Sequence, residues 1–241
     1  MSHFATDDSG TAQAMRLFER DWRTYSKVVA HNYMFHREVY AELRRVLLAE
    51  APGRYSFLDL ACGDTRPTVG ALAGTSIGSY RGIDLSSPAL AIAAKSLTVL
   101  DCRVKLERRD FAEALASLDE DFDVIWVGQS LHHFDRAKKL EVMHDARRVC
   151  GEHGFFIVWE PTCLDHEDQT EWLRRFQSTC RARWAMLEPE EWDAMVDHIK
   201  TSDNPETSAV WHRLGEETGF GRVRDLFTPP LQLNRVYCYQ A

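Results

Sequence analysis

Apolar residues follow two spacings along this chain: short continuous runs, and repeats at every third or fourth residue. A continuous run is typical of a strand buried on both faces of a sheet, and the longer spacing is typical of a helix with one apolar face. The continuous runs predict strands at 55–60, 79–84, 102–107, 123–127 and 154–159. Helical spacing predicts helices between them at 68–73, at 88–97, at 110–118 and along the stripe Leu140, Met143, Ala146 and Cys150. This alternation predicts a parallel sheet with right-handed crossovers and helices on both faces.

The two ends of the chain break the alternation. Residues 11–50 have helical spacing, and residues 160–210 are helical and rich in tryptophan. A last helix at 209–217 is followed by two strands, at 222–227 and 231–239. The short connection between these strands predicts an antiparallel hairpin added to the edge of the sheet.

Length and charge narrow the class of protein. The 241 residues suffice for one α/β domain with a full core. Because 29 basic residues face 37 acidic ones, the net charge is −8, and the surface should repel nucleic acids and anionic membranes. No apolar stretch approaches the roughly 20 residues of a membrane span, and the start lacks the features of a secretory signal. The six cysteines are widely spaced, as free thiols in a reducing cytosol would be. We expect a cytoplasmic protein, either monomer or homodimer.

The strongest chemical signal lies where the first predicted strand ends. Asp59 lies in that strand, and Gly63 follows in a turn where its missing side chain would let a ligand approach the backbone. About 20 residues later, Asp84 ends the second strand, where a carboxylate can accept hydrogen bonds from ribose hydroxyls. This order of strand, glycine turn, helix, strand and acid predicts an adenosine-type cofactor. The residues alone permit either a dinucleotide or S-adenosylmethionine.

Several short motifs resemble those of the class I S-adenosylmethionine-dependent methyltransferases that act on small molecules. LDLACGD at 58–64 resembles the first motif of that family, and GIDLS at 82–86 resembles the second. Asp110 and Phe111 lie where the family recognises adenine, and GQSLHH at 128–133 resembles the loop after its fourth strand. The resemblance covers about residues 50–160 and 205–240. One departure is that the usual three-glycine turn is reduced to a single glycine here, which disfavours a pyrophosphate and therefore the dinucleotide.

The resemblance implies a fold and a division of the chain. The fold is α/β, a doubly wound, mostly parallel seven-stranded sheet of order 3-2-1-4-5-7-6 with the last strand antiparallel. An N-terminal helical lid and a helical insert after strand five complete it. The implied division is a flexible tail (1–10) and a single methyltransferase domain (11–241), which comprises a lid (11–50), a cofactor-binding core (51–160), a substrate cap (161–204) and a closing helix with hairpin (205–241).

The resemblance also implies which residues bind S-adenosylmethionine. The predicted cofactor-binding residues are Asp59, Ala61 and Gly63 for the methionine part, Asp84 for the ribose, Leu85, Asp110 and Phe111 for the adenine, and Gln129 at the mouth of the pocket. A purely structural alternative stands for Asp110, because it could simply cap the helix that follows it.

His132 and His133 are the candidate catalytic residues. They follow the fourth strand at the expected mouth of the pocket, where an acceptor would meet the methyl group. Alignment supplies most of the rate of a methyl transfer, and a base is needed only for an acceptor that binds in its protonated form. A histidine that titrates near neutrality suits this task. Alternatively, one histidine packs into the loop and the other faces solvent.

Four further residues are predicted to touch the substrate. Tyr33 and His36 belong to the expected lid, Glu160 follows the fifth strand, and Trp172 begins a stripe of large residues at four-residue spacing. That stripe, completed by Phe176, Cys180 and Trp184, could equally be core that docks the cap. The acidic run at 165–168 lacks the spaced ligands of a formed site, so no metal is predicted.

The sequence thus favours a methyltransferase that moves a methyl group from S-adenosylmethionine to an oxygen or nitrogen of a small molecule, by direct in-line displacement. The first alternative is a non-catalytic module that binds S-adenosylmethionine, since the cofactor residues would be the same. The second is an NAD(P)-dependent oxidoreductase, for which the expected glycine-rich turn is missing.

Overall fold

The computed structural model describes residues 23–241, and the predicted tail at 1–10 lies outside the described residues. The strands are β1 (Tyr55–Leu60), β2 (Ile77–Asp84), β3 (Arg103–Arg108), β4 (Phe122–Gly128), β5 (Cys150–Cys163), β6 (Glu206–Thr207), β7 (Arg222–Phe227) and β8 (Asn234–Gln240). The α-helices are α2 (His36–Glu50), α3 (Arg66–Leu72), α4 (Ser87–Ser96), α5 (Phe111–Ala116), α6 (Arg136–Val149), α7 (Gln169–Cys180), α8 (Pro189–Ser202) and α9 (Ser208–Glu217). Residues 23–30 are also helical, and the short 3₁₀ helices are η1 (Leu97–Val99) and η2 (Leu131–His133).

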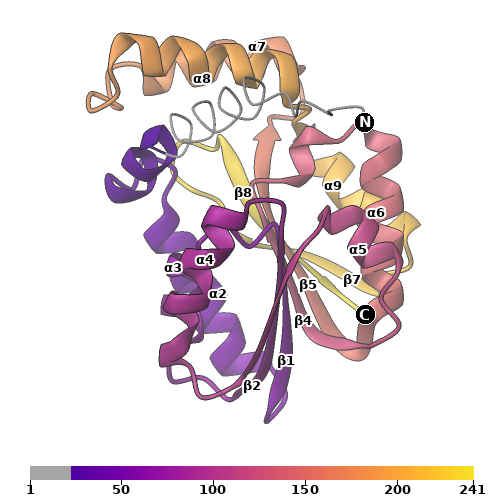
Figure 1. Ribbon diagram of the computed structural model, residues 1–241. Helices are drawn as coiled ribbons and strands as arrows, with labels where there is room; N and C mark the ends of the chain where they lie inside the picture. Colours follow the sequence, from indigo (N-terminus) through magenta and orange to yellow (C-terminus); the bar gives the residue numbers. More distant parts are fainter. Residues whose placement is uncertain (1–22) are drawn as a thin grey trace, which may run out of the picture.

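The strands form one twisted sheet of order β3-β2-β1-β4-β5-β8-β7 (Figure 1). The first five are parallel, whereas β8 runs antiparallel to both of its neighbours, β5 and β7. The predicted α/β fold and its antiparallel last strand are confirmed. The predicted strand order is confirmed as well, because β7 and β8 are the strands predicted as sixth and seventh. The sequence missed β6, which has only two residues and pairs with the end of β5. It also placed the last strand too early, since residues 231–233 precede β8.

Helices cover both faces of the sheet, which explains why its central strands are apolar throughout. In Figure 1, α2, α3 and α4 lie on one face, and α5, α6 and α9 lie on the other. Successive strand residues point to opposite faces, so Phe57 of β1 joins one core and Leu58 joins the other. In the central strand β4, Val124 and Ile125 divide in the same way.

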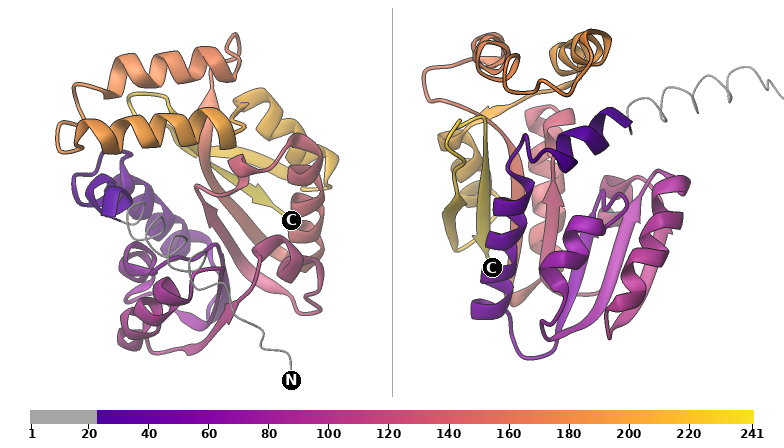
Figure 2. Two further views of the ribbon diagram at one scale, coloured as in Figure 1. Left: turned by 45° about the horizontal axis from the view of Figure 1, so that its top comes forward. Right: turned by 90° about the vertical axis from the view of Figure 1, so that its left-hand side faces the viewer.

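The cap lies across the carboxyl ends of the strands (Figure 2). It consists of α7 and α8, which contact each other side by side. Asp168 begins α7 with a reciprocal capping box to Glu171, and Pro189 occupies the first turn of α8. The cap has a small core of its own, whose large members are Trp172, Phe176, Trp184, Leu187 and Trp192.

The predicted helical stretch at 11–50 is interrupted within its described part. Residues 31–34 form a turn, and Phe35 has a left-handed backbone with φ 64° before α2 begins. Asn32 also has positive φ, which asparagine tolerates well, and its side-chain oxygen accepts a hydrogen bond from the Arg37 amide at 2.9 Å. The chain therefore bends here. No helix within residues 23–241 is long and apolar enough to cross a bilayer.

A close helix–sheet contact at Gly215 of α9 yields a stability prediction. A methyl group added at Gly215 would lie 2.5 Å from the ring of Tyr239, which is fully buried, and 2.7 Å from Val223. We expect Gly215→Ala to lower the free energy of unfolding by about 1–3 kcal/mol, because a packed core resists added volume. Gly70→Ala in α3 is the control, because its added methyl group would meet no atom within 4 Å. Urea unfolding of both variants measures the difference, and equal midpoints would contradict the tight contact.

Candidate functional site

The carboxylate of Asp84 links the ends of the first two strands. Its Oδ2 atom accepts a hydrogen bond from the Gly63 amide at 2.8 Å, and its Oδ1 atom accepts one from the Ser86 amide at 2.7 Å. The structure therefore brings together the glycine turn and the acid that the sequence singled out. Each carboxylate oxygen has a second lone pair that can accept a hydroxyl hydrogen.

The turn after β1 faces open space. Gly63 has φ 55°, and an added Cβ would meet no described atom within 4 Å, so packing does not require a glycine there. Ala61 and Thr65 also have left-handed backbones, with φ 53° and 59°. The Thr65 hydroxyl is buried and makes no hydrogen bond within residues 23–241. Open space at Gly63 beside an unpartnered buried hydroxyl fits a ligand at this turn.

Asp59 lies beneath the turn and is almost fully buried. Burial raises the pKa of its carboxyl to about 7, against the hydrogen bond of 2.7 Å that the Tyr80 hydroxyl donates to Oδ2. Near neutral pH this group therefore holds its proton for part of the time. A cationic amino group bound nearby would favour the ionised carboxylate and lower that pKa.

The residues predicted to hold an adenine ring lie at the neighbouring strand ends. Asp110 caps α5, since its Oδ1 atom accepts hydrogen bonds from the Ala112 and Glu113 amides. The cap uses one of the two carboxylate oxygens, so the structural alternative for Asp110 holds without excluding a ligand. The Phe111 ring contacts the Phe134 ring, with centroids 5.4 Å apart. Leu85 is 64% exposed, although it is a large apolar residue.

A cavity of about 360 Å³ lies between the cap and the carboxyl ends of the strands. Most of its wall is apolar. Its cap and hairpin side includes Trp172, Phe176, Trp184, Met195, Leu231 and Leu233. Its opposite side comes from residues 24–35 and includes Tyr25, Val28, Tyr33 and Met34. The Tyr33 and Trp184 rings are stacked at an angle of 7°, so the two sides meet through aromatic contact.

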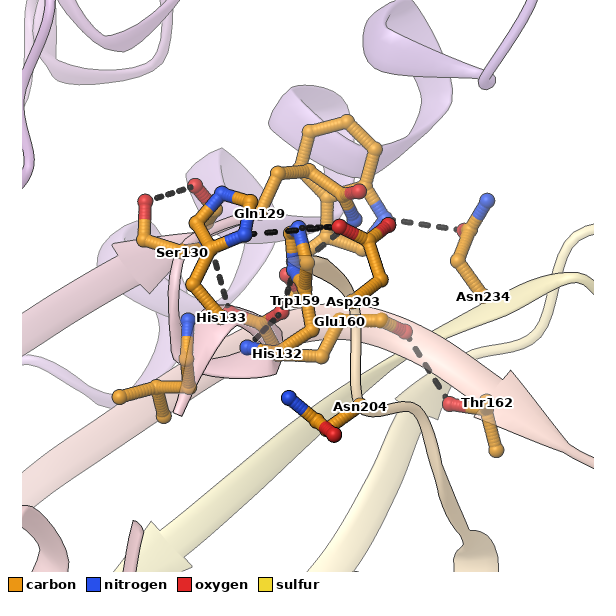
Figure 3. Close-up of polar contacts among 12 residues, drawn as sticks. Gln129, Ser130, His132, His133, Trp159, Glu160, Thr162, Asp203, Asn204 and Asn234 are labelled. Carbon is orange, nitrogen blue, oxygen red and sulfur yellow. Dashed lines mark hydrogen bonds and ion pairs between the residues drawn. The ribbon is translucent and has the colours of Figure 1, made fainter. Parts of the chain in front are cut away.

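Polar side chains gather at one end of this cavity (Figure 3). His132 is 5% exposed, and its Nδ1 atom lies 2.6 Å from Oε2 of Glu160, which is fully buried. The same glutamate accepts hydrogen bonds from the backbone amides of Ser130, Leu131 and His132. Glu160 therefore fixes both the loop after β4 and the orientation of the His132 ring. With Nδ1 donating to the carboxylate, Nε2 carries the lone pair.

Asp203, which the sequence analysis missed, completes the polar end. It follows α8, is 5% exposed, and its Oδ1 atom lies 3.4 Å from Nδ1 of His133 and 3.6 Å from Nε2 of His132. Burial alone would lower the pKa of His133, but the Asp203 carboxylate outweighs it and the pKa is raised. His198 of α8 lies 3.8 Å from the same oxygen. Nothing in the local sequence distinguishes this aspartate from other acids of the cap.

Comparison with known proteins identifies the fold and the domain. Residues 57–154 match the family model described as "Methyltransferase domain". The structure of an O-methyltransferase family protein from Burkholderia thailandensis shares 16% identity and a TM-score of 0.61; the match covers 87% of this chain and 57% of that one. Magnesium protoporphyrin IX methyltransferase from Synechocystis PCC 6803, with bound S-adenosylmethionine, shares 13% identity and a TM-score of 0.59 over 99% of both chains. No curated protein sequence matches.

Residues 57–154 thus form a methyltransferase domain, and the chain as a whole has the class I methyltransferase fold. The Synechocystis neighbour holds S-adenosylmethionine, the cofactor that the motifs at 58–64 and 82–86 predict for this chain. The chain spans 57–67% of the length of the first three solved structures that it matches.

Only two of the four predicted substrate residues line the cavity. Tyr33 and Trp172 line the cavity, together with the predicted catalytic residues His132 and His133. His36 is buried edge-on against Trp159, outside the lining, and burial lowers the pKa of its ring to about 4. Glu160 also lies outside the lining and reaches the cavity only through His132. Gln129, predicted at the mouth of the cofactor pocket, is a lining residue.

Proposed function

We propose that this methyltransferase transfers a methyl group to an oxygen of a small, largely apolar acceptor with an aromatic ring. The cavity carries the proposal, because its aromatic walls end at two histidines beside Gln129, on the sheet edge that also holds Asp84 and Gly63. Ligand sites of this size are mostly apolar, with few polar groups that orient the ligand. A nitrogen acceptor is the closest alternative.

The cofactor residues keep the roles that the family resemblance suggests. In this proposal Asp84 holds the ribose hydroxyls, Asp59, Ala61 and Gly63 accommodate the methionine part, and Leu85, Asp110 and Phe111 surround the adenine. The bond between Asp84 and the Gly63 amide supports the first of these roles, and the open space at Gly63 supports the second. Gln129 would stand between cofactor and acceptor, because it follows β4 and lines the cavity.

When bound, S-adenosylmethionine supplies a methyl group on a cationic sulfur that departs as a neutral thioether. The protein's own task is to align the acceptor and to exclude water, which supplies most of the rate of such a transfer. The apolar side chains of the cap and of residues 24–35 on either side of the cavity would limit the access of water. His132 would receive or share the acceptor's proton, since Glu160 holds its Nε2 lone pair toward the cavity.

The choice of oxygen rests on one resemblance, and the choice of a small acceptor rests on the cavity volume and the net charge. The Burkholderia structure that this chain resembles is named as an O-methyltransferase family protein. The cavity of about 360 Å³ lies at the small end of ordinary ligand sites, which begin at about 300 Å³. The net charge of −8 opposes a nucleic-acid acceptor.

Calorimetry and an acceptor screen test the proposal together. We expect micromolar binding of S-adenosylmethionine and S-adenosylhomocysteine, no binding of NADH, and release of S-adenosylhomocysteine with some members of a panel of phenols and hydroxylated heterocycles. Turnover with aromatic amines alone would replace oxygen by nitrogen. Tight cofactor binding without turnover on any acceptor would favour the non-catalytic binding module.

A cavity-filling substitution separates acceptor binding from cofactor binding. Ala194 of α8 lines the cavity, so Ala194→Trp should occupy acceptor space. We expect it to raise the acceptor KM at least about tenfold, since an overfilled pocket loses more than 1.4 kcal/mol of binding energy, while the Kd for S-adenosylmethionine stays unchanged. Asp193→Trp is the control, because Asp193 is next to Ala194 in α8 but is exposed and lies outside the cavity lining. An unchanged acceptor KM for Ala194→Trp would place the acceptor elsewhere.

A further inference from the structure

Three side chains at the polar end of the cavity form a cluster with the composition of a metal site. His132, His133 and Asp203 each present one ligand atom, and these atoms all lie within 4.8 Å of one another. All three residues line the cavity. Imidazole nitrogens and a carboxylate oxygen are ligands that divalent transition metals such as Zn²⁺ accept.

The contacts of Asp203 with the two histidines are longer than charge-assisted hydrogen bonds and close to the edges of a coordination polyhedron. Oδ1 of Asp203 lies 3.6 Å from Nε2 of His132 and 3.4 Å from Nδ1 of His133. A charge-assisted hydrogen bond would bring such atoms to about 2.7–2.9 Å. Two ligands at about 2.1 Å from a tetrahedral ion stand about 3.4 Å apart.

Asp203 supplies independent support for a cation. Its side chain is 6% exposed and points at both imidazoles, with which its Oδ1 atom forms the long ion-pair contacts drawn in Figure 3. Within residues 23–241 this oxygen accepts no well-aligned hydrogen bond. A buried carboxylate oxygen is costly unless a positive charge stands beside it, and here that charge is either a protonated His133 at 3.4 Å or a bound cation. The second buried carboxylate, Glu160, lies at the other side of the His132 ring and adds to the negative potential.

Glu160 and His132 also have the arrangement of a supported metal ligand. A histidine that binds a metal through one ring nitrogen nearly always donates the other N–H to a carboxylate or carbonyl oxygen. Nδ1 of His132 makes this contact with Glu160 at 2.6 Å, which directs Nε2 toward Asp203. The carboxylate would fix the tautomer and raise the basicity of the ligand.

The segment that carries Asp203 is held firmly against the loop of the two histidines. The Asn204 amide donates to the His132 carbonyl at 2.6 Å, and the buried Lys139 donates to the Asn204 carbonyl. The Gln169 side chain donates to the Asp203 carbonyl. The three ligand atoms therefore meet without a rearrangement of the backbone, which favours tight binding of an ion.

We propose that His132, His133 and Asp203 bind a divalent transition-metal ion, with a remaining position open to the cavity for the acceptor's oxygen. His198, whose Nε2 atom lies 3.8 Å from Oδ1 of Asp203, stands at the edge of this site as an outer ligand. The ion's part in catalysis rests on the proposed function: it would orient the acceptor and lower the pKa of its hydroxyl. Its binding is independent of that function. In the metal-bound protein the ion takes the place of His132 as the group that acts on the acceptor's proton, because the Nε2 lone pair of His132 is then bound to the ion.

Cobalt(II) is the probe, because its visible absorption reports both binding and ligand geometry. Tag-free protein is treated with a chelator, dialysed and titrated with Co²⁺, and Zn²⁺ is then added in competition. We expect one Co²⁺ per chain, the strong visible bands of a four-coordinate site, no thiolate charge-transfer band, and displacement by Zn²⁺. Asp203→Asn and His133→Gln each remove one ligand and should weaken binding at least about tenfold, the smaller effect seen for supporting residues of metal sites.

His212→Gln is the matched control. His212 forms the same kind of contact on the surface, with its Nε2 atom 2.7 Å from Oδ1 of Asp225, but it has no place in the cluster. It should bind Co²⁺ as the unaltered protein does. Absence of saturable binding, or equal affinity in all variants that remain folded by circular dichroism, would overturn the metal site and leave an imidazolium–carboxylate pair.

The same preparation separates failure of the metal site from failure of the proposed function. Acceptor turnover that is equal with and without chelator, together with no Co²⁺ binding, would overturn the ion and leave the methyltransferase proposal intact. Binding of one Co²⁺ by protein that methylates no acceptor would support the site and count against the proposed function.

Discussion

Asp84→Ala is expected to weaken the binding of S-adenosylmethionine about 100-fold. In the proposed function the ribose donates two hydrogen bonds to this carboxylate and would lose both. Two bonds to a charged acceptor contribute about 3 kcal/mol or more, equivalent to about two powers of ten in Kd. The substitution would also release the Gly63 amide, which Asp84 holds at 2.8 Å. Calorimetric titration with S-adenosylmethionine and S-adenosylhomocysteine measures the effect.

Two further variants show whether the charge or the turn is responsible. Asp84→Asn keeps one oxygen for the backbone amides and should lose about tenfold in affinity, the difference between a charged and a neutral acceptor. Asp119→Ala removes an exposed acid beyond α5 and should bind both ligands normally. Wild-type affinity in Asp84→Ala, with an unchanged melting temperature, would exclude the ribose role of this residue.

The fold could be predicted from the sequence because each local signal agreed with its neighbours. Residues 55–60 are bounded by a glycine before them and a turn after them, and the predicted strand coincides with β1. The fifth strand was predicted too short, at 154–159, whereas β5 spans Cys150–Cys163. The predicted strand began at Gly154, but Cys150 pairs with Phe122 across a register shift and so extends the strand. Pairing between strands overrode the local preference.

The candidate site was predictable only where its residues share one segment. His132 and His133 follow β4 directly, so the strand pattern placed them at the carboxyl edge of the sheet. Asp203 reaches them from 70 residues further along, because α8 crosses that edge and ends beside the loop. No spacing rule links two segments whose meeting depends on the packing of an entire cap.

The roles of His36 and Glu160 show a second limit of the sequence. The helical pattern at 11–50 put Tyr33 and His36 in one lid, but the left-handed Phe35 turns α2 away from the residues before it. Tyr33 thus lines the cavity and His36 packs on Trp159. Glu160 ends in the apolar interior because four donors of the loop after β4 converge on it. Backbone donors leave no signature in a sequence.

Those four donors make Glu160→Gln the most informative test of the histidine. An amide offers one acceptor oxygen, so in either orientation its NH₂ group would face two of the hydrogens that Glu160 now accepts, and His132 would lose its fixed ring. We expect kcat to fall about 100-fold or more, the usual contribution of a positioned proton-transfer group, with an unchanged Kd for S-adenosylmethionine. Stability should fall by about 2–4 kcal/mol, because a buried polar network is left partly unsatisfied. Glu152→Gln, an exposed glutamate of the same strand, should leave both quantities unchanged.

A double-variant cycle then shows whether Glu160 acts through His132. Both the role of base and the role of metal ligand require the Nε2 lone pair, and both fail when the ring loses its anchor at Nδ1. If Glu160 acts through this ring, adding His132→Gln to Glu160→Gln should lower kcat little further, because residues that work as a unit are strongly non-additive. Multiplicative losses in the double variant would show that the two residues act separately. Full activity of Glu160→Gln in a folded protein would remove His132 from the reaction altogether.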